Sequence, residues 1–246
     1  IGIPSKGIQH FKDDILPLYQ RYDTPFVASI SAPTVDDFAY ICEQLSIPGV
    51  DAIEVNISCP NIEDDGKAFA MRPEPTFQVM KKLKSVTGVP LWAKLTPNTG
   101  ETIEVAKAAE EAGTDALVVS NTVLAMQIDI NTFKPSLGNI MGGLSGPAIK
   151  PIVLRMVYQC NKIVSIPIIG CGGIASAEDA IEFIIAGATA VQVGTATFIN
   201  PLTMVSVISD FEIYCRKKGI ERVSDLIGKV NDQNTPDNAA LIEVDV

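Results

Sequence analysis

The chain is poor in the residues that zinc sites require. It contains a single histidine, His10, and its five cysteines are scattered along the sequence without a CxxC pair. Histidines and closely spaced cysteine pairs are the usual ligands of zinc, so the sequence offers no zinc-type ligand set. Scattered free cysteines fit a reducing compartment, and we therefore expect a cytoplasmic protein.

Long apolar runs and an excess of basic residues are also missing. The longest apolar stretches, such as 163–169 and 188–193, are far shorter than the roughly 20 residues of a membrane helix. The chain carries 19 Lys and Arg against 29 Asp and Glu, whereas nucleic-acid binding needs clustered basic side chains. We therefore expect neither a membrane span nor a nucleic-acid partner.

What the sequence does contain is an alternation of short β-branched runs with helical patterns. The 246 residues are 47% hydrophobic, which suits one large globular domain. Thr34 and Ser176 are typical helix N-caps, and Gly113 and Gly219 are typical helix ends. Between the helices, buried parallel strands are predicted at 26–31, 52–58, 91–97, 116–122, 167–174 and 190–196.

This alternation predicts an α/β fold, a (β/α)8 TIM barrel, of which six strands are visible. Because the chain begins at Ile1 without Met, we expect the two remaining strands in an N-terminal stretch that precedes this sequence. We assign 1–230 to the barrel and 231–246 to a C-terminal tail. A doubly wound open sheet is the alternative, ranked lower because no GxGxxG turn follows a predicted strand. Residues 127–137 predict a hairpin bordering the active site.

The predicted strand at 52–58 leads into the polar string Asn56-Ile57-Ser58-Cys59-Pro60-Asn61. Most free cysteines are buried small hydrophobic residues, and Cys59 can be one of them. Two flanking carboxamides make that interpretation weaker, because buried amides need hydrogen-bond partners. In a barrel this string lies at the mouth, where the chemistry of the fold is located.

Lys94 interrupts an apolar run in the next strand, at a position expected to point into the barrel. An unpaired buried ammonium costs several kcal/mol, so Lys94 either reaches solvent, pairs with a core carboxylate or binds a ligand. A flavin is the obvious ligand, because its N1–C2=O edge gains negative charge on reduction.

Further polar and glycine-rich strings follow the later strands. Ser120, Asn121 and Thr122 supply hydrogen-bonding side chains, and glycine-rich turns occur at 142–147, 170–173 and 194–195. Any one of these glycines can serve only a tight turn. As a set they predict a phosphate site, because barrels often bind phosphate with the loops after strands 7 and 8.

These strings together resemble the dihydroorotate dehydrogenases, and most closely class 1B, the catalytic subunits of the NAD-linked enzymes. The resemblance covers Ile1 to about Val230 and is most specific at NISCPN (56–61), AKLTPN (93–98), SNT (120–122), GGLSGPAIKP (142–151), GCGGI (170–174) and VGTA (193–196). Class 2 members carry serine at the position of Cys59, so the cysteine indicates class 1. Where the family commonly has Asn, this chain has Ser29.

The resemblance implies a role for each matching residue. Cys59 would be the catalytic base, and Asn56 would touch both substrate and flavin. The substrate would also contact Ile1, Gly2, Ile3, Asn61, Asn121 and Thr122. FMN would contact Lys94, Ser120, Gly146, Gly172, Gly173, Gly194 and Thr195, the last four around its phosphate. The family's leading Asn and a lysine would lie upstream of Ile1, so a polypeptide of this length should not be a complete enzyme.

The activity so implied is the oxidation of dihydroorotate to orotate in de novo pyrimidine biosynthesis. Cys59 would remove the C5 proton, FMN would accept the C6 hydride, and activity should rise with pH as the thiol ionises. The partners implied are a second copy in a homodimer and an FAD/iron–sulfur electron-transfer subunit.

Three other functions stay open at this stage. A pyrimidine-reducing relative of the dihydropyrimidine dehydrogenase type shares the barrel, the flavin and the cysteine. An aldolase- or isomerase-like barrel could bind a sugar phosphate, with Lys94 forming a Schiff base. A noncatalytic scaffold is less favoured, because it leaves the polar strand ends unexplained.

Overall fold

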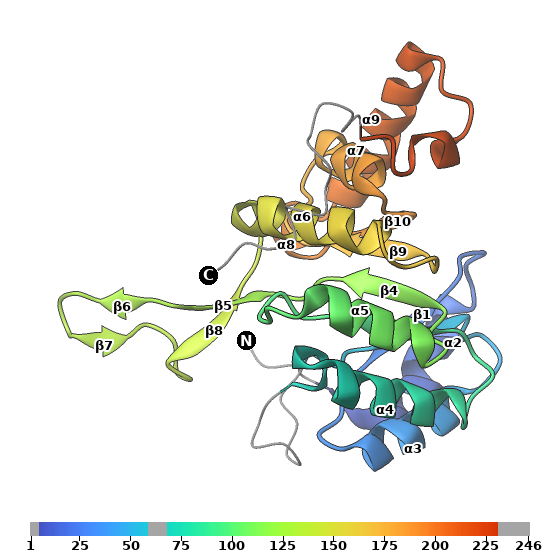
Figure 1. Ribbon diagram of the computed structural model, residues 1–246, viewed down its shortest axis with the longest axis vertical. Helices are drawn as coiled ribbons and strands as arrows, with labels where there is room; N and C mark the ends of the chain where they lie inside the picture. Colours follow the sequence, from blue (N-terminus) through green and yellow to red (C-terminus); the bar gives the residue numbers. More distant parts are fainter. Residues whose placement is uncertain (1–4, 59–67, 231–246) are drawn as a thin grey trace.

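The structure, a computed structural model, describes residues 5–58 and 68–230 and is built around a six-stranded parallel sheet (Figure 1). In spatial order the strands are β1 (Val27–Ile30), β2 (Ala52–Val55), β3 (Leu91–Lys94), β4 (Ala116–Val119), β9 (Ile168–Cys171) and β10 (Ala190–Gln192). All six predicted strands are confirmed, but each ends earlier than predicted. The polar residues at their carboxyl ends lie beyond the strands, in the segments that lead to the next elements.

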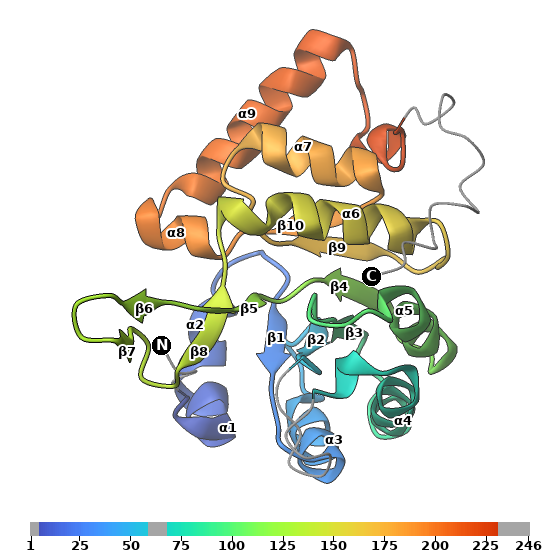
Figure 2. The same cartoon turned by 60° about the vertical axis from the view of Figure 1, so that its left-hand side comes forward.

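Helices follow the strands and cover the outer face of the sheet. α3 (Val35–Leu45), α4 (Pro73–Lys84) and α5 (Thr102–Glu111) accompany β1 to β4, whereas α6 (Lys150–Asn161), α7 (Ala177–Ala186) and α9 (Thr203–Lys218) gather around β9 and β10 (Figure 2). Shorter helices are α1 (Gly7–His10), α2 (Leu16–Tyr19) and α8 (Thr195–Ile199), with a π-helical turn at Phe11–Ile15 and 3-10 turns at Phe69–Met71, Pro147–Ile149 and Val223–Leu226. Within the described residues no helix is long and apolar enough to cross a membrane.

The sheet is curled, and its two faces differ. Residues such as Ile53 and Leu117 are fully buried in the large core beneath the helices. On the concave face, Gln192 of β10 donates from Nε2 to Glu54 Oε2 of β2 at 2.7 Å. Three strands separate β2 from β10, so a flat sheet with about 4.8 Å between strands would hold them about 19 Å apart. The sheet is therefore the arc of a barrel, as predicted, and not a doubly wound open sheet.

The predicted helix ends are confirmed. Thr34 accepts a hydrogen bond from the backbone N–H of Asp37 at 3.1 Å and so caps α3. Ser176 and Asp179 form a reciprocal capping box at the start of α7. α9 ends at Gly219, whose φ of 65° is the left-handed conformation that glycine adopts most easily.

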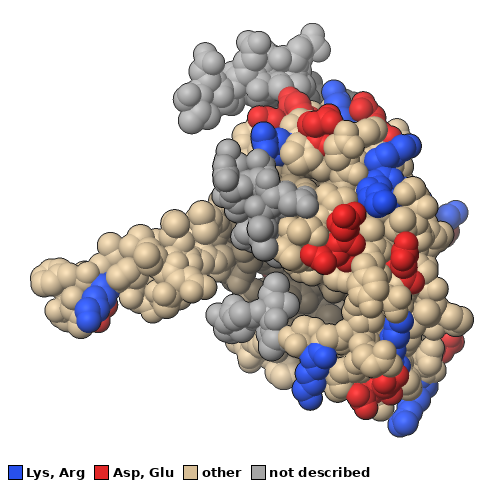
Figure 3. Space-filling model, turned by 90° about the horizontal axis from the view of Figure 1, so that it is seen from below, with Lys and Arg blue, Asp and Glu red and all other residues tan. Residues whose placement is uncertain are grey.

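An antiparallel arm at residues 123–144 projects from the body (Figure 1). β5 (Val123–Met126) pairs with β8 (Met141–Leu144), and beyond them β6 (Ile128–Asp129) pairs with β7 (Lys134–Pro135). The predicted hairpin at 127–137 is thus confirmed, but the longer ribbon of β5 and β8 was not predicted. The arm carries only two charged residues, Asp129 and Lys134, and Figure 3 shows it as a projection that is almost entirely uncharged.

Asp179 is the residue whose replacement tests the junction between α6 and α7. Its carboxylate accepts from Lys150 Nζ at 2.7 Å and from the backbone N–H groups of Ala175 and Ser176. Burial acts to raise the pKa of Asp179, but these hydrogen bonds and the charge of Lys150 outweigh burial and lower it. The lowered pKa means that Asp179 stabilises the fold above its unfolded-state pKa, and this contribution is lost as pH falls through the folded-state pKa.

We expect Asp179→Asn to lower the free energy of unfolding by about 1–2 kcal/mol near neutral pH. Denaturant unfolding at several pH values measures this loss, which should shrink toward zero as the solution becomes strongly acidic. Asp210→Asn, at an exposed position on α9, is the matched control and should change little. Equal losses in the two variants would contradict the assignment.

Candidate active site

A cavity of about 210 Å³ lies at the carboxyl ends of β3, β4, β9 and β10. Eight residues were expected to contact flavin, and all of them except Asn56 line this cavity. The seven are Lys94, Ser120, Gly146, Gly172, Gly173, Gly194 and Thr195. The structure thus brings together residues that are up to 101 positions apart in sequence (Lys94 to Thr195). Lys94 is the only charged side chain among the described residues that line this cavity.

The loops after β9 and β10 offer backbone N–H groups to the cavity. Gly172 and Gly173 have φ values of 151° and 78°, and Gly194 immediately precedes α8. In the described part of the chain, the N–H groups of these three glycines donate to no acceptor. Clustered backbone donors of this kind form anion-binding concavities. Beside them the hydroxyls of Thr195 and Ser145 lie 2.8 Å apart.

Two of these positions require glycine for different reasons. A Cβ on Gly173 would lie 2.8 Å from the backbone N of Lys150 and 2.9 Å from the carbonyl oxygen of Gly146, so this loop is packed tightly against α6. A Cβ on Gly194 would meet nothing within 4 Å. Since Gly194 lines the cavity, the space beside it is open to a ligand.

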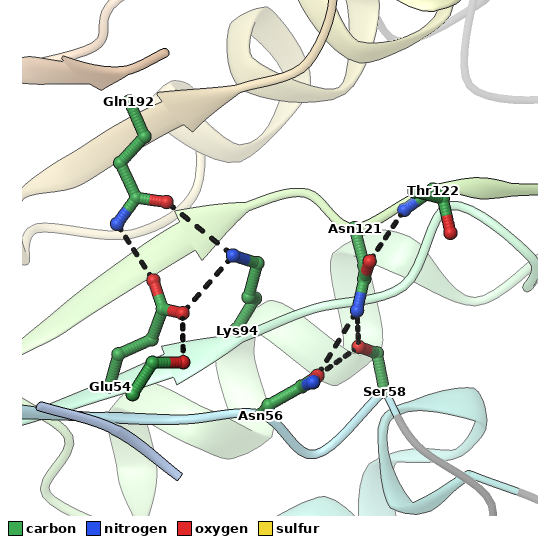
Figure 4. A network of polar contacts seen from close by, with 8 residues as sticks. Glu54, Asn56, Ser58, Lys94, Asn121, Thr122 and Gln192 are labelled. Atoms are coloured by element: carbon green, nitrogen blue, oxygen red, sulfur yellow. Dashed lines mark hydrogen bonds and ion pairs between the residues drawn. The ribbon is translucent and has the colours of Figure 1, made fainter. Parts of the chain in front are cut away.

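An amide and hydroxyl cluster lies next to this cavity (Figure 4). Asn121 donates from Nδ2 to Asn56 Oδ1 at 3.1 Å and also to Ser58 Oγ, and Ser58 donates to Asn56 Oδ1. The backbone N–H of Thr122 donates to Asn121 Oδ1 at 2.8 Å. The turns after β2 and β4 therefore orient each other, and they do so with neutral groups.

A second cavity, of about 330 Å³, adjoins the first and shares Asn121 and Thr122 with it. Ser58, Asn98, Leu124 and Gly143 are also among its lining residues, so the base of the arm borders this cavity. None of the residues of the predicted hairpin at 127–137 is among the described residues that line either cavity, so its place beside the site stays a prediction. β6 and β7 lie at the end of the arm that projects from the body (Figure 1).

The turn predicted at 142–147 differs from the structure. Gly142 and Gly143 lie in β8, and a Cβ on Gly143 would lie 2.2 Å from Thr122 Oγ1. The glycine therefore permits close approach of the ribbon to the site and is no part of a phosphate turn. Gly146 does reach the first cavity, with a φ of 89° before the 3-10 turn.

Lys94 has a buried counter-charge that the sequence did not disclose. Its Nζ lies 3.1 Å from Glu54 Oε1, and Glu54 is only 4% exposed. Lys94 thus pairs with a core carboxylate and lines the cavity at once. Glu54, Gln192 and Asn98 were not identified as site residues from the sequence. Glu54 and Gln192 are polar residues at inward-facing positions of β2 and β10, which was the signal available for them. For Asn98 the signal was a polar side chain just after the end of β3.

Cys171 also lines the first cavity, but its surroundings keep it a thiol. Burial raises the pKa of Cys171; the charge of Lys94 acts to lower it, and that of Glu54 to raise it further. A neutral, buried thiol is a poor base, so Cys171 is no rival for the role predicted for Cys59. Cys59 itself lies outside the described residues, as do Asn61, Ile1, Gly2 and Ile3.

Gly173→Ala tests how tightly the loop after β9 is held. At a φ of 78° and with backbone atoms 2.8 Å from the new methyl, alanine forces the loop or α6 to move. We expect the free energy of unfolding to fall by about 1–3 kcal/mol, measured by chemical denaturation. Gly100→Ala, where a Cβ meets nothing within 4 Å, is the control. A Gly173→Ala protein as stable as that control would contradict the packing described.

Comparison with known proteins agrees with this geometry. A family model described as dihydroorotate dehydrogenase matches residues 1–213. Three similar proteins, each called the catalytic subunit of dihydroorotate dehydrogenase B (NAD(+)), come from Thermoanaerobacter sp. (strain X514), Caldicellulosiruptor saccharolyticus and Alkaliphilus oremlandii. They are 44%, 45% and 46% identical to this chain over 94% of its length and 76%, 77% and 76% of theirs. The chain therefore belongs to the dihydroorotate dehydrogenase family.

Proposed function

We propose that this protein oxidises (S)-dihydroorotate to orotate, with FMN in the first cavity and Cys59 as the base. The observation that carries the proposal is the gathering of seven predicted flavin contacts around one cavity, next to an amide cluster, in a chain of this family. The class 1B assignment is supported by relatives named as catalytic subunits of the NAD-linked enzyme.

The donor set of the first cavity fits FMN. The N–H groups of Gly172, Gly173 and Gly194 and the hydroxyl of Thr195 suit a phosphate, which helix and loop N–H groups bind without a cationic side chain. Lys94 and Ser120 would hold the polar edge of the ring, and Gly146 closes the wall beside the phosphate loop. When bound, FMN supplies the oxidant that takes the hydride from C6 of the substrate.

The amide cluster suits a planar, anionic pyrimidine. Asn56, Asn121 and Thr122 would meet its carboxylate and ring amides with neutral donors and acceptors, and Asn61, Ile1, Gly2 and Ile3 would complete the contacts. Cys59 would take the proton from C5 while the hydride leaves C6, so that the C5=C6 bond of orotate forms. Ser58, its neighbour in the sequence, lines the second cavity.

The sugar-phosphate alternative is disfavoured by the ion pair at Lys94. A Schiff base forms from a neutral amine, whereas Lys94 donates to the buried carboxylate of Glu54. The pyrimidine-reducing alternative would use the same two cavities. Only the choice of substrate distinguishes it from the oxidation of dihydroorotate. The proposal also includes a homodimer, a cytoplasmic location and an electron-transfer partner that carries FAD and an iron–sulfur cluster. The relatives' designation as catalytic subunits supports the electron-transfer partner.

An anaerobic visible spectrum of the purified full-length protein tests the proposed function. We expect a flavin band that bleaches when dihydroorotate is added, because the substrate delivers its hydride to FMN. Cys59→Ser should keep the band but slow the bleaching by about 10²–10⁴-fold, the usual contribution of a general base. A band that responds to dihydrouracil and not to dihydroorotate would replace the proposal with the pyrimidine-reducing activity, and absence of any flavin would overturn it.

Gly194→Ala tests the phosphate loop separately from the fold. The added methyl meets no protein atom within 4 Å and projects where the ligand would lie, so stability should be unchanged. We expect the dissociation constant of FMN to rise at least about tenfold, equivalent to about 1.4 kcal/mol, as measured by flavin fluorescence on titration into the flavin-free protein. Gly88→Ala, also in open space, is the control. If Gly194→Ala binds FMN with unchanged affinity, the assignment of the phosphate to this loop is contradicted.

A further inference from the structure

Glu54 is a carboxylate placed inside the curl of the sheet, where a charge is costly unless it is fully partnered. Three strands supply its partners. Ser29 Oγ of β1 donates at 2.7 Å. Figure 4 shows the other two donors, Lys94 Nζ of β3 at 3.1 Å and Gln192 Nε2 of β10 at 2.7 Å. Glu54 as a whole is only 4% exposed. Its position is therefore fixed from both sides of the arc.

The amide of Gln192 joins the two charges. Its Nε2 donates to Glu54 Oε2, and its Oε1 accepts from Lys94 Nζ at 3.5 Å. A carboxamide offers a donor and an acceptor on neighbouring atoms and carries no charge. Gln192 therefore fixes the distance between carboxylate and ammonium without adding charge, and the group of three is neutral overall.

One proton of Lys94 is left for a ligand. The ammonium has three donors, of which one faces Glu54 and one faces Gln192; among the described residues the third has no acceptor. Lys94 and Gln192 both line the first cavity, whereas Glu54 does not. The positive member of the pair thus meets the ligand, and the negative member lies behind it.

The geometry points to Glu54 and Gln192 as positioning residues that set the reduction potential of FMN through Lys94. This inference rests on the proposed function. Reduction adds negative charge to the N1–C2=O edge of the ring, and an unbalanced ammonium nearby would strongly favour the reduced form. The carboxylate behind Lys94 offsets part of that effect, so the reduced cofactor can still pass its electrons to an acceptor.

A series of charge variants tests this role. The midpoint potential of bound FMN is measured anaerobically against reference dyes, with dithionite as reductant and no substrate. Glu54→Gln makes the group more positive and should raise the potential, whereas Gln192→Glu, at alkaline pH where the new carboxylate is ionised, should lower it. We expect each change to alter the preference for reduced over oxidised FMN about tenfold, which is about 30 mV for a two-electron couple.

Two controls separate charge balance from general damage. The double variant Glu54→Gln with Lys94→Gln is neutral again, and its potential should return toward the original value. Glu212→Gln, on the exposed face of α9 beside Arg216, removes one negative charge far from the cavity and should leave the potential unchanged. A structural effect alone would not reverse sign between Glu54→Gln and Gln192→Glu, nor be restored by the double variant.

The outcomes distinguish this inference from the proposed function. A protein that binds FMN and is bleached by dihydroorotate, but whose variants share one potential, overturns the role of Glu54 and Gln192 and leaves the function standing. A protein that takes up no FMN overturns both. If Glu54→Gln fails to fold, Gln192→Glu, which also exchanges side chains of equal size, carries the test alone, and a potential that does not fall at alkaline pH then contradicts the inference.

Discussion

The buried carboxylate of Glu54 is the constraint on which the site depends. A charge inside a curled sheet is tolerated only with several hydrogen-bond donors, and here they come from β1, β3 and β10. Because β10 reaches back to β2, the arc is held closed enough for distant strand ends to share one cavity. The same carboxylate fixes Lys94, the only charged group in the cavity wall among the described residues.

The curl also explains why the chemistry is gathered at one end of the molecule. All six strands are parallel, so their carboxyl ends point the same way and the turns that follow them converge. The turns after β2 and β4 supply neutral amides that hydrogen bond to one another, and those after β9 and β10 supply backbone N–H groups. One rim therefore offers separate places for a polar ring and for an anion.

Much of this could be predicted from the sequence, because local patterns determine it. Six β-branched runs, the N-caps Thr34 and Ser176 and the inward lysine all carry short-range signals, and the structure confirms them. The partners of Lys94 could not be found that way. Gln192 lies 138 positions from Glu54, and only the curvature of the sheet brings the two together.

The ribbon of β5 and β8 was not predicted, and the glycines of β8 were assigned to a turn, for another reason. β5 and β8 expose apolar side chains such as Leu124 and Met141, so the alternation that indicates a half-buried strand carries little information there. Gly143 resembles a turn residue in sequence, yet it is needed because Thr122 lies against it. Tertiary contact, and not local conformation, selects that glycine.

Backbone hydrogen–deuterium exchange, compared between FMN-loaded and flavin-free protein, tests the central claim most directly, since the account assigns the phosphate to particular N–H groups. Exchange should slow in peptides that contain Gly172 and Gly173 and in those that contain Gly194 and Thr195, while α3 and α4 on the far side stay unchanged. Protection that appears elsewhere, with both glycine loops exchanging at the same rate in the two forms, would contradict it.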